Sequence, residues 1–358
     1  MLDRTFRNVA DLVREHAAAR PQQPALVCGE ERLSWAQLDA LLDRIAASLQ
    51  RDGLRPGDTI ALCGWSTPTQ AALFLGGLRA GAAVAPLSPS VTPGDFAALL
   101  RDCDARCLFV DAAAQHLVPE EAIARCIALE PGAHGRALDD WLAPSGTMPR
   151  AVAVEPDMPF NIIYSSGTTG TPKGIVQPHR MRWMHVLRGP AGGYGPDTVT
   201  LLATPLYSNT TLVAFFPALG MGSTIVLMPK FDPARYLELA ERHRVTHSML
   251  VPVQYQRILA LPQFAEHDLS SFRMKFATSS PFPAALKREV LARWPGGLME
   301  YYGMTEGAAP ATCPRICIPT SCTRSDSRER TMTSASSTTR GANCRAAKPA
   351  RSSATRRR

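Results

Sequence analysis

The chain has 358 residues, which is enough for one large domain or for two or three smaller ones. Its apolar content of 45% is typical of a globular protein, and no run of about eighteen apolar residues marks a transmembrane helix. The first residues, Met1–Arg7, lack the apolar core of a signal peptide, which favours a cytoplasmic protein. None of the nine cysteines forms a C-x-x-C pair, so free thiols are expected rather than a zinc or redox site of that kind.

The formal net charge of +8 comes from one end of the chain. Residues 311–358 contain 11 of the 39 Lys/Arg residues and 2 of the 31 Asp/Glu residues. The rest of the chain therefore has 28 basic and 29 acidic residues. A nucleic-acid-binding domain carries its basic residues on the folded part. Here the part outside 311–358 is close to neutral, which argues against a nucleic-acid partner.

The first half of the chain alternates between strands and helices. An apolar face that includes Val9 and Val13 predicts a helix, Pro24–Cys28 predicts a strand, and Ser34 is placed as the N-cap of a second helix. Strands separated by helices of about ten residues imply a parallel sheet covered by helices. The elements predicted next are the strands 57–63, 82–87 and 107–110 and the helices 69–80 and 95–102.

The stretch from 116 to 157 is poorly patterned and rich in Ala, Pro and Gly. We interpret it as a surface excursion that returns to a strand at Ala151–Val154. The second half is again α/β in character. Its predicted elements are a helix that begins at Pro178–His185, strands over 200–203, 224–228 and 246–252, and a helix over 232–244.

A loop rich in Gly, Ser and Thr follows a predicted buried strand, Phe160–Ile163, which is interrupted only by the polar Asn161. Three glycines, two serines and three threonines occupy the ten positions Ser165–Gly174. Glycine lets backbone N–H groups approach a ligand, hydroxyls add donors, and Lys173 adds a positive charge suited to phosphate. The pattern is neither a Walker loop nor G-x-G-x-x-G. It predicts a loop that holds nucleotide phosphates, with a polar surface turn as the alternative.

Ser165–Gly174 resembles, without a gap, the phosphate-loop signature [ST]-[SG]-G-[ST]-T-G-x-P-K-G of the AMP-forming acyl/aryl-CoA synthetase superfamily. A second stretch, Tyr301–Gly307, is similar to the family's Tyr-Gly-x-Thr-Glu motif and follows the loop by about 130 residues, as it does in the family. The resemblance implies an α/β fold, namely the large N-terminal domain of adenylate-forming enzymes with helix-flanked, mostly parallel sheets. It also implies an acid–thiol ligase that uses ATP, Mg²⁺ and coenzyme A.

In the reaction that the resemblance implies, a carboxylate attacks the α-phosphorus of ATP, giving an acyl-adenylate and pyrophosphate, and a thiol then displaces AMP. Lys173, Thr305 and Glu306 take the catalytic roles: Lys173 binds phosphate, Thr305 donates to the α-phosphate and Glu306 binds Mg²⁺. The ring of Tyr302 stacks on adenine. The residues assigned to the nucleotide are Ser165, Ser166, Gly167, Thr168, Thr169, Gly170, Thr171, Lys173, Ser279, Ser280, Pro281, Tyr301, Tyr302, Gly303 and Thr305.

The resemblance assigns four further residues to the carboxylic acid: Tyr207, Ser208, Asn209 and Thr278. Ser208 stands where the family usually has His, which leaves the orientation of the substrate open. Thr278 replaces a usual Gly, and its β-branched side chain should narrow the pocket in favour of a short or flat acid, unless a neighbouring residue simply shifts. His247 matches no motif, so we interpret it as a core or edge residue rather than as a base.

From Ala311 the composition collapses into Ser, Thr, Arg, Ala and Cys, which predicts a disordered segment. Codons can be chosen for Ile316–Ser325 such that a two-base shift gives Leu-His-Pro-Asp-Lys-Leu-His-Thr-Val, and the same shift across Ser325–Ser353 permits further family-like strings. We therefore expect an incomplete N-terminal domain over 1–310 and an out-of-frame tail over 311–358. The family's ribose-binding Asp, its hinge and its small C-terminal domain with a catalytic Lys are not found in this sequence.

The leading interpretation is an acid–CoA ligase impaired by this shift. The alternatives are an adenylation domain that loads a carrier protein, a non-catalytic nucleotide-binding remnant, and a nucleic-acid binder with a basic tail. The expected partners are a small carboxylic acid, ATP and coenzyme A, without nucleic acid or a transmembrane segment. The acid and the oligomeric state are left open.

Overall fold

The computed structural model describes residues 5–130, 134–165, 173–301, 303, 305 and 315–317. All of them belong to the first of two compact units, Met1–Pro319, and none to the second, Thr320–Arg358. The catalytic Glu306, the adenine-stacking Tyr302 and the loop residues Ser166–Thr171 of the sequence prediction lie outside the described residues.

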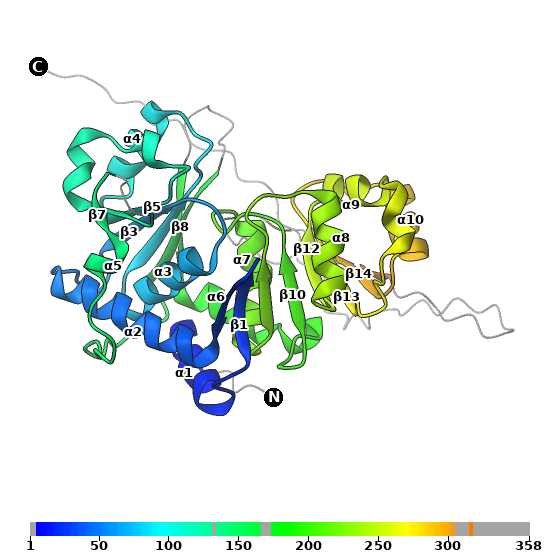
Figure 1. The fold of residues 1–358 in the computed structure, drawn as a ribbon, viewed down its shortest axis with the longest axis horizontal. Helices are drawn as coiled ribbons and strands as arrows, with labels where there is room; N and C mark the ends of the chain where they lie inside the picture. The colour runs from blue at the N-terminus through cyan, green and yellow to red at the C-terminus, as the bar shows by residue number, and fades with distance from the viewer. Residues whose placement is uncertain are drawn as a thin grey trace, which may run out of the picture. The chain divides into compact units, whose positions relative to one another are not determined.

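The first sheet is mostly parallel (Figure 1). Its outermost pairs, β14 with β15 and β1 with β2, are antiparallel, and the pairs between them are parallel. The strands lie in the order β15 (Arg315–Cys317), β14 (Gly297–Glu300), β13 (Met274–Ala277), β12 (His247–Leu250), β10 (Val199–Leu202), β11 (Thr224–Leu227), β1 (Pro24–Cys28) and β2 (Glu31–Ser34).

The second sheet has the same character, because only its last pair, β8 with β9, is antiparallel. The strands lie in the order β7 (Arg136–Ala137), β6 (Cys126–Ala128), β5 (Ala105–Val110), β3 (Thr59–Cys63), β4 (Ala83–Leu87), β8 (Pro159–Ser165) and β9 (Lys173–Pro178). The predicted phosphate loop therefore lies, in the sequence, between the two strands at one edge of this sheet.

The helices begin where the sequence offers caps. The Ser34 hydroxyl oxygen accepts from the N–H of Gln37, and the Ser34 N–H donates to the side-chain oxygen of Gln37, which confirms the predicted cap. Asp232 caps the helix that follows it. The helices are α1 (Val9–Ala19), α2 (Trp35–Arg51), α3 (Pro68–Arg79), α4 (Pro93–Asp102), α5 (Leu138–Trp141), α6 (His179–Leu187), α7 (Asn209–Gly220), α8 (Pro233–Arg242), α9 (Pro252–Leu259) and α10 (Ala284–Arg293). Short 3-10 helices are η1 (Gln115–Leu117), η2 (Glu120–Arg125), η3 (Pro190–Gly192) and η4 (Pro262–Glu266).

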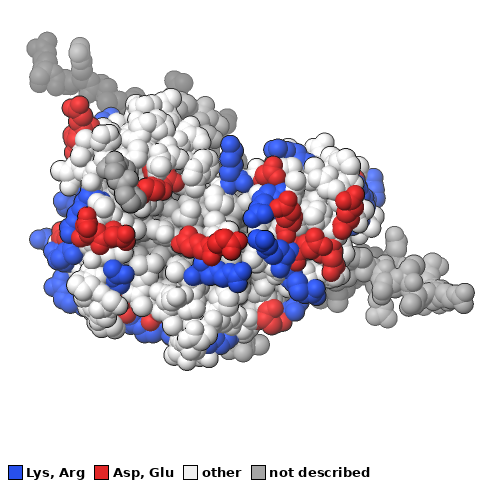
Figure 2. All heavy atoms as spheres, in the orientation of Figure 1, with Lys and Arg blue, Asp and Glu red and all other residues white. Residues whose placement is uncertain are grey.

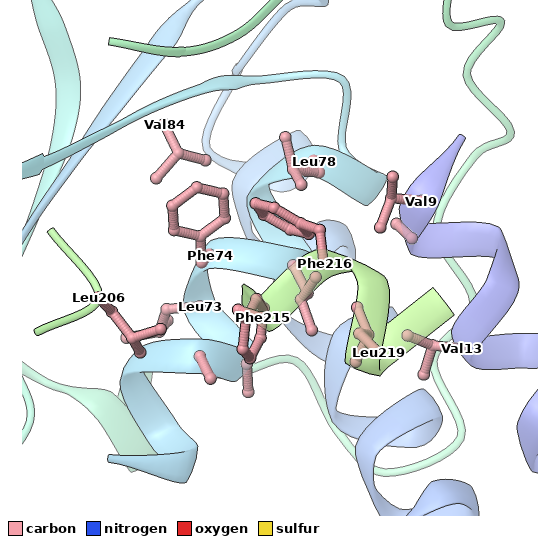
Figure 3. Close-up of a cluster of buried hydrophobic side chains, with 14 of the residues drawn as sticks. Val9, Val13, Leu73, Phe74, Leu78, Val84, Leu206, Phe215, Phe216 and Leu219 are labelled. Atoms are coloured by element: carbon pink, nitrogen blue, oxygen red, sulfur yellow. The ribbon is translucent and has the colours of Figure 1, made fainter. Parts of the chain in front are cut away.

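The largest core cluster lies between the two sheets. It contains side chains from α1, α2, α3, α6 and α7 together with one face of each sheet, and part of it is drawn in Figure 3. Neighbouring strand residues point to opposite faces, so Leu202 joins this core while Leu201 joins the cluster under α8, α9 and α10. Likewise Ile60 faces the shared core and Ala61 faces the cluster under α4.

The predicted α/β class and the strands and helices of the first half are confirmed, but one predicted strand is wrong and one observed strand was not predicted. Ala151–Val154 forms no strand, because β4 already has β3 and β8 as its neighbours. Its Val152 instead lies against the turn at Gly81, where a Cβ would be only 2.8 Å from Val152 Cγ1. The antiparallel strand Lys173–Pro178 was not predicted at all.

The described surface carries charges of both signs, and the described cysteines are free, as the composition predicts. On the face drawn in Figure 2, Lys/Arg and Asp/Glu side chains of the described residues are interspersed. Described cysteines are free thiols, namely Cys28, Cys63, Cys103, Cys107 and Cys126. Among the described helices, none is both long enough and apolar enough to span a bilayer.

Candidate active site

The residues at the two ends of the predicted phosphate loop are paired in a hairpin. Ser165, the last residue of β8, is the register partner of Lys173, the first residue of β9. The Lys173 side chain is exposed at this point, where it can reach an anion. The residues between them lie outside the described part of the chain. Among the described residues of the loop, Lys173 therefore carries the charge that is available to a ligand.

Thr305 of the second motif lies beside this hairpin. Thr305 accepts a hydrogen bond at its carbonyl oxygen from Gln177 Nε2, at 2.6 Å, and Gln177 lies on β9 four residues after Lys173. Tyr301 follows β14, donates its backbone N–H to Ala277 at 2.8 Å, and stacks on Phe276 with the ring centroids 5.5 Å apart. Gln177, on the strand that begins at Lys173, is thus in direct contact with a described residue of the second motif. Gly303 is exposed.

The residues assigned to the acid lie at the start of α7. Ser208 is its N-cap and accepts from the N–H of Thr210 at 3.3 Å, so it has a structural role that does not need the imidazole usual at this position. Tyr207, Ser208 and Asn209 are all partly buried. The hydroxyl of Thr210 is hydrogen-bonded to that of Ser279, which joins this helix end to the segment Thr278–Pro281.

Ser279 has a left-handed backbone, with φ of +79°. A non-glycine residue in this region carries strain, and such residues concentrate at functional sites. Thr278 is partly buried, whereas Ser279, Ser280 and Pro281 are exposed. The structure therefore presents these three exposed residues at the end of β13, next to the start of α7.

A buried polar cluster lies behind these segments, and sequence reasoning missed it. Arg182 on α6 has no exposed surface and donates to Asn161 on β8, Gln177 on β9 and Asn209 on α7. Burial lowers the pKa of Arg182 to about 9. The available signal was Asn161, a polar residue in the middle of an otherwise apolar strand.

His247 is a satisfied core residue, as predicted. It is fully buried, its Nδ1 is 2.8 Å from the Thr246 hydroxyl, and its Nε2 is 3.1 Å from the Gly192 carbonyl oxygen. Burial lowers its pKa to about 4, so the ring is neutral near pH 7. Both ring nitrogens are in use, and neither is free to act as a base.

The described residues contain no group of three or more His, Cys, Asp or Glu side chains that could hold a metal ion. Glu306, which the family resemblance assigns to Mg²⁺, lies outside the described residues.

Comparison with known proteins agrees with this geometry. The family model described as AMP-binding enzyme matches residues 13–345. Indoleacetate–CoA ligase from Aromatoleum aromaticum is 33% identical over 318 residues, which cover 86% of this chain and 60% of that protein. 4-Coumarate–CoA ligase 3 from Oryza sativa subsp. japonica is 30% identical, over 81% of this chain and 55% of that protein.

Solved structures show the same fold. The inhibitor-bound N-terminal domain of FACL13 from Mycobacterium tuberculosis superimposes with a TM-score of 0.75 at 25% identity, covering 84% of this chain and 77% of that one. The chain therefore belongs to the AMP-binding enzyme family, whose model matches most of its length. It spans somewhat over half the length of the curated relatives named above.

Proposed function

We propose that this chain binds ATP and a carboxylic acid and forms the adenylation part of an acid–CoA ligase. The observation that carries the proposal is the hydrogen bond from Gln177, on the strand that leaves the phosphate loop, to Thr305 of the second motif. It supports a single site in which both family motifs act on one nucleotide.

The chemistry needs positioning and neutralisation of charge rather than a covalent enzyme residue. One carboxylate oxygen of the acid attacks the α-phosphorus, and the bond to pyrophosphate breaks. Lys173 binds the β- and γ-phosphates and so favours departure of the negatively charged pyrophosphate. Thr305 donates its hydroxyl to the α-phosphate, with its backbone held by Gln177. Mg²⁺, when bound, neutralises phosphate charge, and Glu306 is the residue that would hold it.

The acid binds, in this proposal, between the start of α7 and the segment after β13. Asn209 and Ser279 belong to these two segments, which the Thr210–Ser279 hydrogen bond joins. The partly buried Thr278 narrows the space next to them, which favours a short or flat acid. The relatives named for indoleacetate and 4-coumarate are consistent with a flat, aromatic acid.

We also propose that residues 311–358 are translated out of frame. The proposal rests on their composition and on the family-like strings that the shifted codons permit. Of these residues the structure describes Arg315–Cys317, which pair with β14, and the family match extends to residue 345. Sequencing the coding DNA decides the matter: an uninterrupted frame with no family-like sequence in the shifted frame would contradict the proposal.

The test of function is formation of a CoA thioester from ATP, CoA and a panel of fatty, benzoic and cinnamic acids. The 358-residue chain should form little or none, because a tail that is translated out of frame supplies none of the family's charge contacts to the reacting groups, and one such contact is worth about a hundredfold or more. A protein whose frame is restored upstream of Ile316 should recover activity. Robust turnover by the 358-residue chain would contradict the account of the tail. A restored protein that is inactive on every acid would favour carrier loading or a non-catalytic remnant.

A further inference from the structure

Arg182 is the centre of a buried hydrogen-bond cluster that comprises Asn161, Gln177, Arg182 and Asn209. The Nε of Arg182 donates to Asn161 Oδ1 at 3.1 Å, and its Nη2 donates to Asn209 Oδ1 at 2.9 Å and to Gln177 Oε1. The guanidinium also lies over the ring of Phe216, 5.6 Å from its centroid. The three amide acceptors belong to three different elements, β8, β9 and α7.

The cluster reaches the proposed site in two directions. While Gln177 accepts from Arg182 with its oxygen, it donates with its nitrogen to the Thr305 carbonyl at 2.6 Å. The same nitrogen is 3.5 Å from Asn209 Oδ1, at the start of the helix that carries the residues assigned to the acid. A continuous path of hydrogen bonds therefore runs from Arg182 to both halves of the proposed site.

The need to fill the core does not by itself explain why residue 182 is an arginine. Burying a guanidinium costs free energy, and an apolar side chain of similar volume often stabilises a core equally well or better. What the arginine adds is a planar fork of five N–H donors, which can hold several acceptors in fixed relative positions. A lysine has the charge but not this geometry.

We infer that Arg182 is a positioning residue of the active site: through Gln177 it fixes the backbone of Thr305, and through Asn209 it fixes the start of α7. The inference rests on the proposed function, since it assigns Arg182 the task of holding the nucleotide side and the acid side of that site in register. Arg182 acts through these two residues and does not touch substrate.

The first test is titration with ATP and Mg²⁺. The variants Arg182→Met and Gln177→Leu each break the path, and each should weaken ATP binding about tenfold, the effect expected for loss of a hydrogen bond to a charged group. Because both act on one path, the double variant should be little weaker than either single variant. Arg182→Lys should recover only part of the affinity, since lysine lacks the fork.

Two matched variants control for loss of stability. Arg79→Met removes another buried arginine, which is bound to Asp39 and Asp43, and Gln254→Leu removes another buried glutamine, which donates to Ala203. Both should keep ATP affinity within about twofold of the unmodified chain. Arg182→Met and Gln177→Leu variants that bind ATP like the unmodified chain would overturn the inference, and so would equal weakening in the control variants.

A second measurement separates this inference from the proposed function. Hydrogen–deuterium exchange without nucleotide reports how firmly the peptide containing Thr305 is held. In Arg182→Met and Gln177→Leu its exchange should rise about tenfold relative to the rest of the chain, and in the control variants it should not. If the unmodified chain bound no ATP, the proposed function would fail, and exchange would still decide the positioning role. Unchanged exchange at this peptide would overturn it.

Discussion

Phe216 on α7 lies where the two sheets share their core, and its removal should be costly. The ring is fully buried and lies next to that of Phe74 on α3 (Figure 3). The ring centroid of Phe216 lies 5.8 Å from that of Phe74 and 4.9 Å from that of Phe160 on β8. Helix α7 touches the first sheet on its other side, at β10, β11 and β12. A cavity at this ring therefore loosens contacts between the sheets.

The magnitude follows from the area and from the cavity. An aromatic side chain buries about 200 Å², which at ~25 cal/mol per Å² corresponds to about 5 kcal/mol as an upper value. Measured Phe→Ala changes in cores cost about 3–5 kcal/mol. We expect Phe216→Ala to lower the free energy of unfolding by about 4 kcal/mol, a large part of the ~5–15 kcal/mol that holds a typical domain together.

The assay is urea unfolding followed by tryptophan fluorescence and circular dichroism. Phe216→Leu keeps most of the apolar volume and should cost about 1–2 kcal/mol. Val253→Ala, at a side chain that is 56% exposed, should change the free energy of unfolding by less than about 0.5 kcal/mol. A loss below about 1 kcal/mol for Phe216→Ala would refute the view that one core joins the two sheets.

Three further predictions concern pH, capping and selectivity. Burial lowers the pKa of His247 from 6.5 to about 4, so the unfolded chain binds a proton at a higher pH than the folded chain does. The free energy of unfolding should therefore fall, by up to about 3 kcal/mol, as the pH drops from 6.5 towards 4. In urea unfolding over this range His247→Gln should lose less stability than the unmodified chain, and an identical loss would count against the assignment. Ser34→Ala removes the hydroxyl that accepts from the Gln37 N–H, while the backbone N–H of residue 34 can still donate to the Gln37 side chain. The melting temperature should fall by an amount equivalent to about 1 kcal/mol, whereas an unchanged melting temperature would contradict the cap. Thr278→Gly in a frame-restored protein should shift turnover towards longer acids by about tenfold, and an unaltered acid profile would contradict a narrow pocket.

Much of the fold was predictable because its signals are local. Apolar runs of strand length separated by capped helices indicate a parallel sheet, and these elements appear as expected from Pro24 to Val110. Ser34 with Gln37 three residues later has the spacing of a capping box, and the structure contains it. The class of fold required no knowledge of which strands are neighbours.

The errors concern neighbours in space. Ala151–Val154 has strand composition, yet the place beside β4 is taken by β8, so the segment finds no partner. Lys173–Pro178 has little strand signal of its own and is a strand because it pairs with β8. Both outcomes depend on competition for sheet positions, which the pattern of a short segment does not contain.

The candidate site also has parts that local sequence predicts and parts that depend on neighbours in space. The loop and the second motif could be found from residue order alone, because their chemistry is concentrated in short stretches. Arg182 and Gln177 could not, since a polar residue in a sequence gives no sign that it will be buried beside two others from distant elements. Asn161 within an apolar strand was the one visible hint.

The central claim is that Ser165–Lys173 and Thr305–Glu306 form one ATP site, and nucleotide titration tests it most directly. The unmodified chain, Lys173→Ala and Glu306→Gln are titrated with ATP in the presence and absence of Mg²⁺. We expect Lys173→Ala to weaken binding under both conditions and Glu306→Gln to abolish most of the gain from Mg²⁺, each charge contact being worth about 2–3 kcal/mol at a partly dry site. Equal affinity in all three proteins, with and without Mg²⁺, would contradict the account.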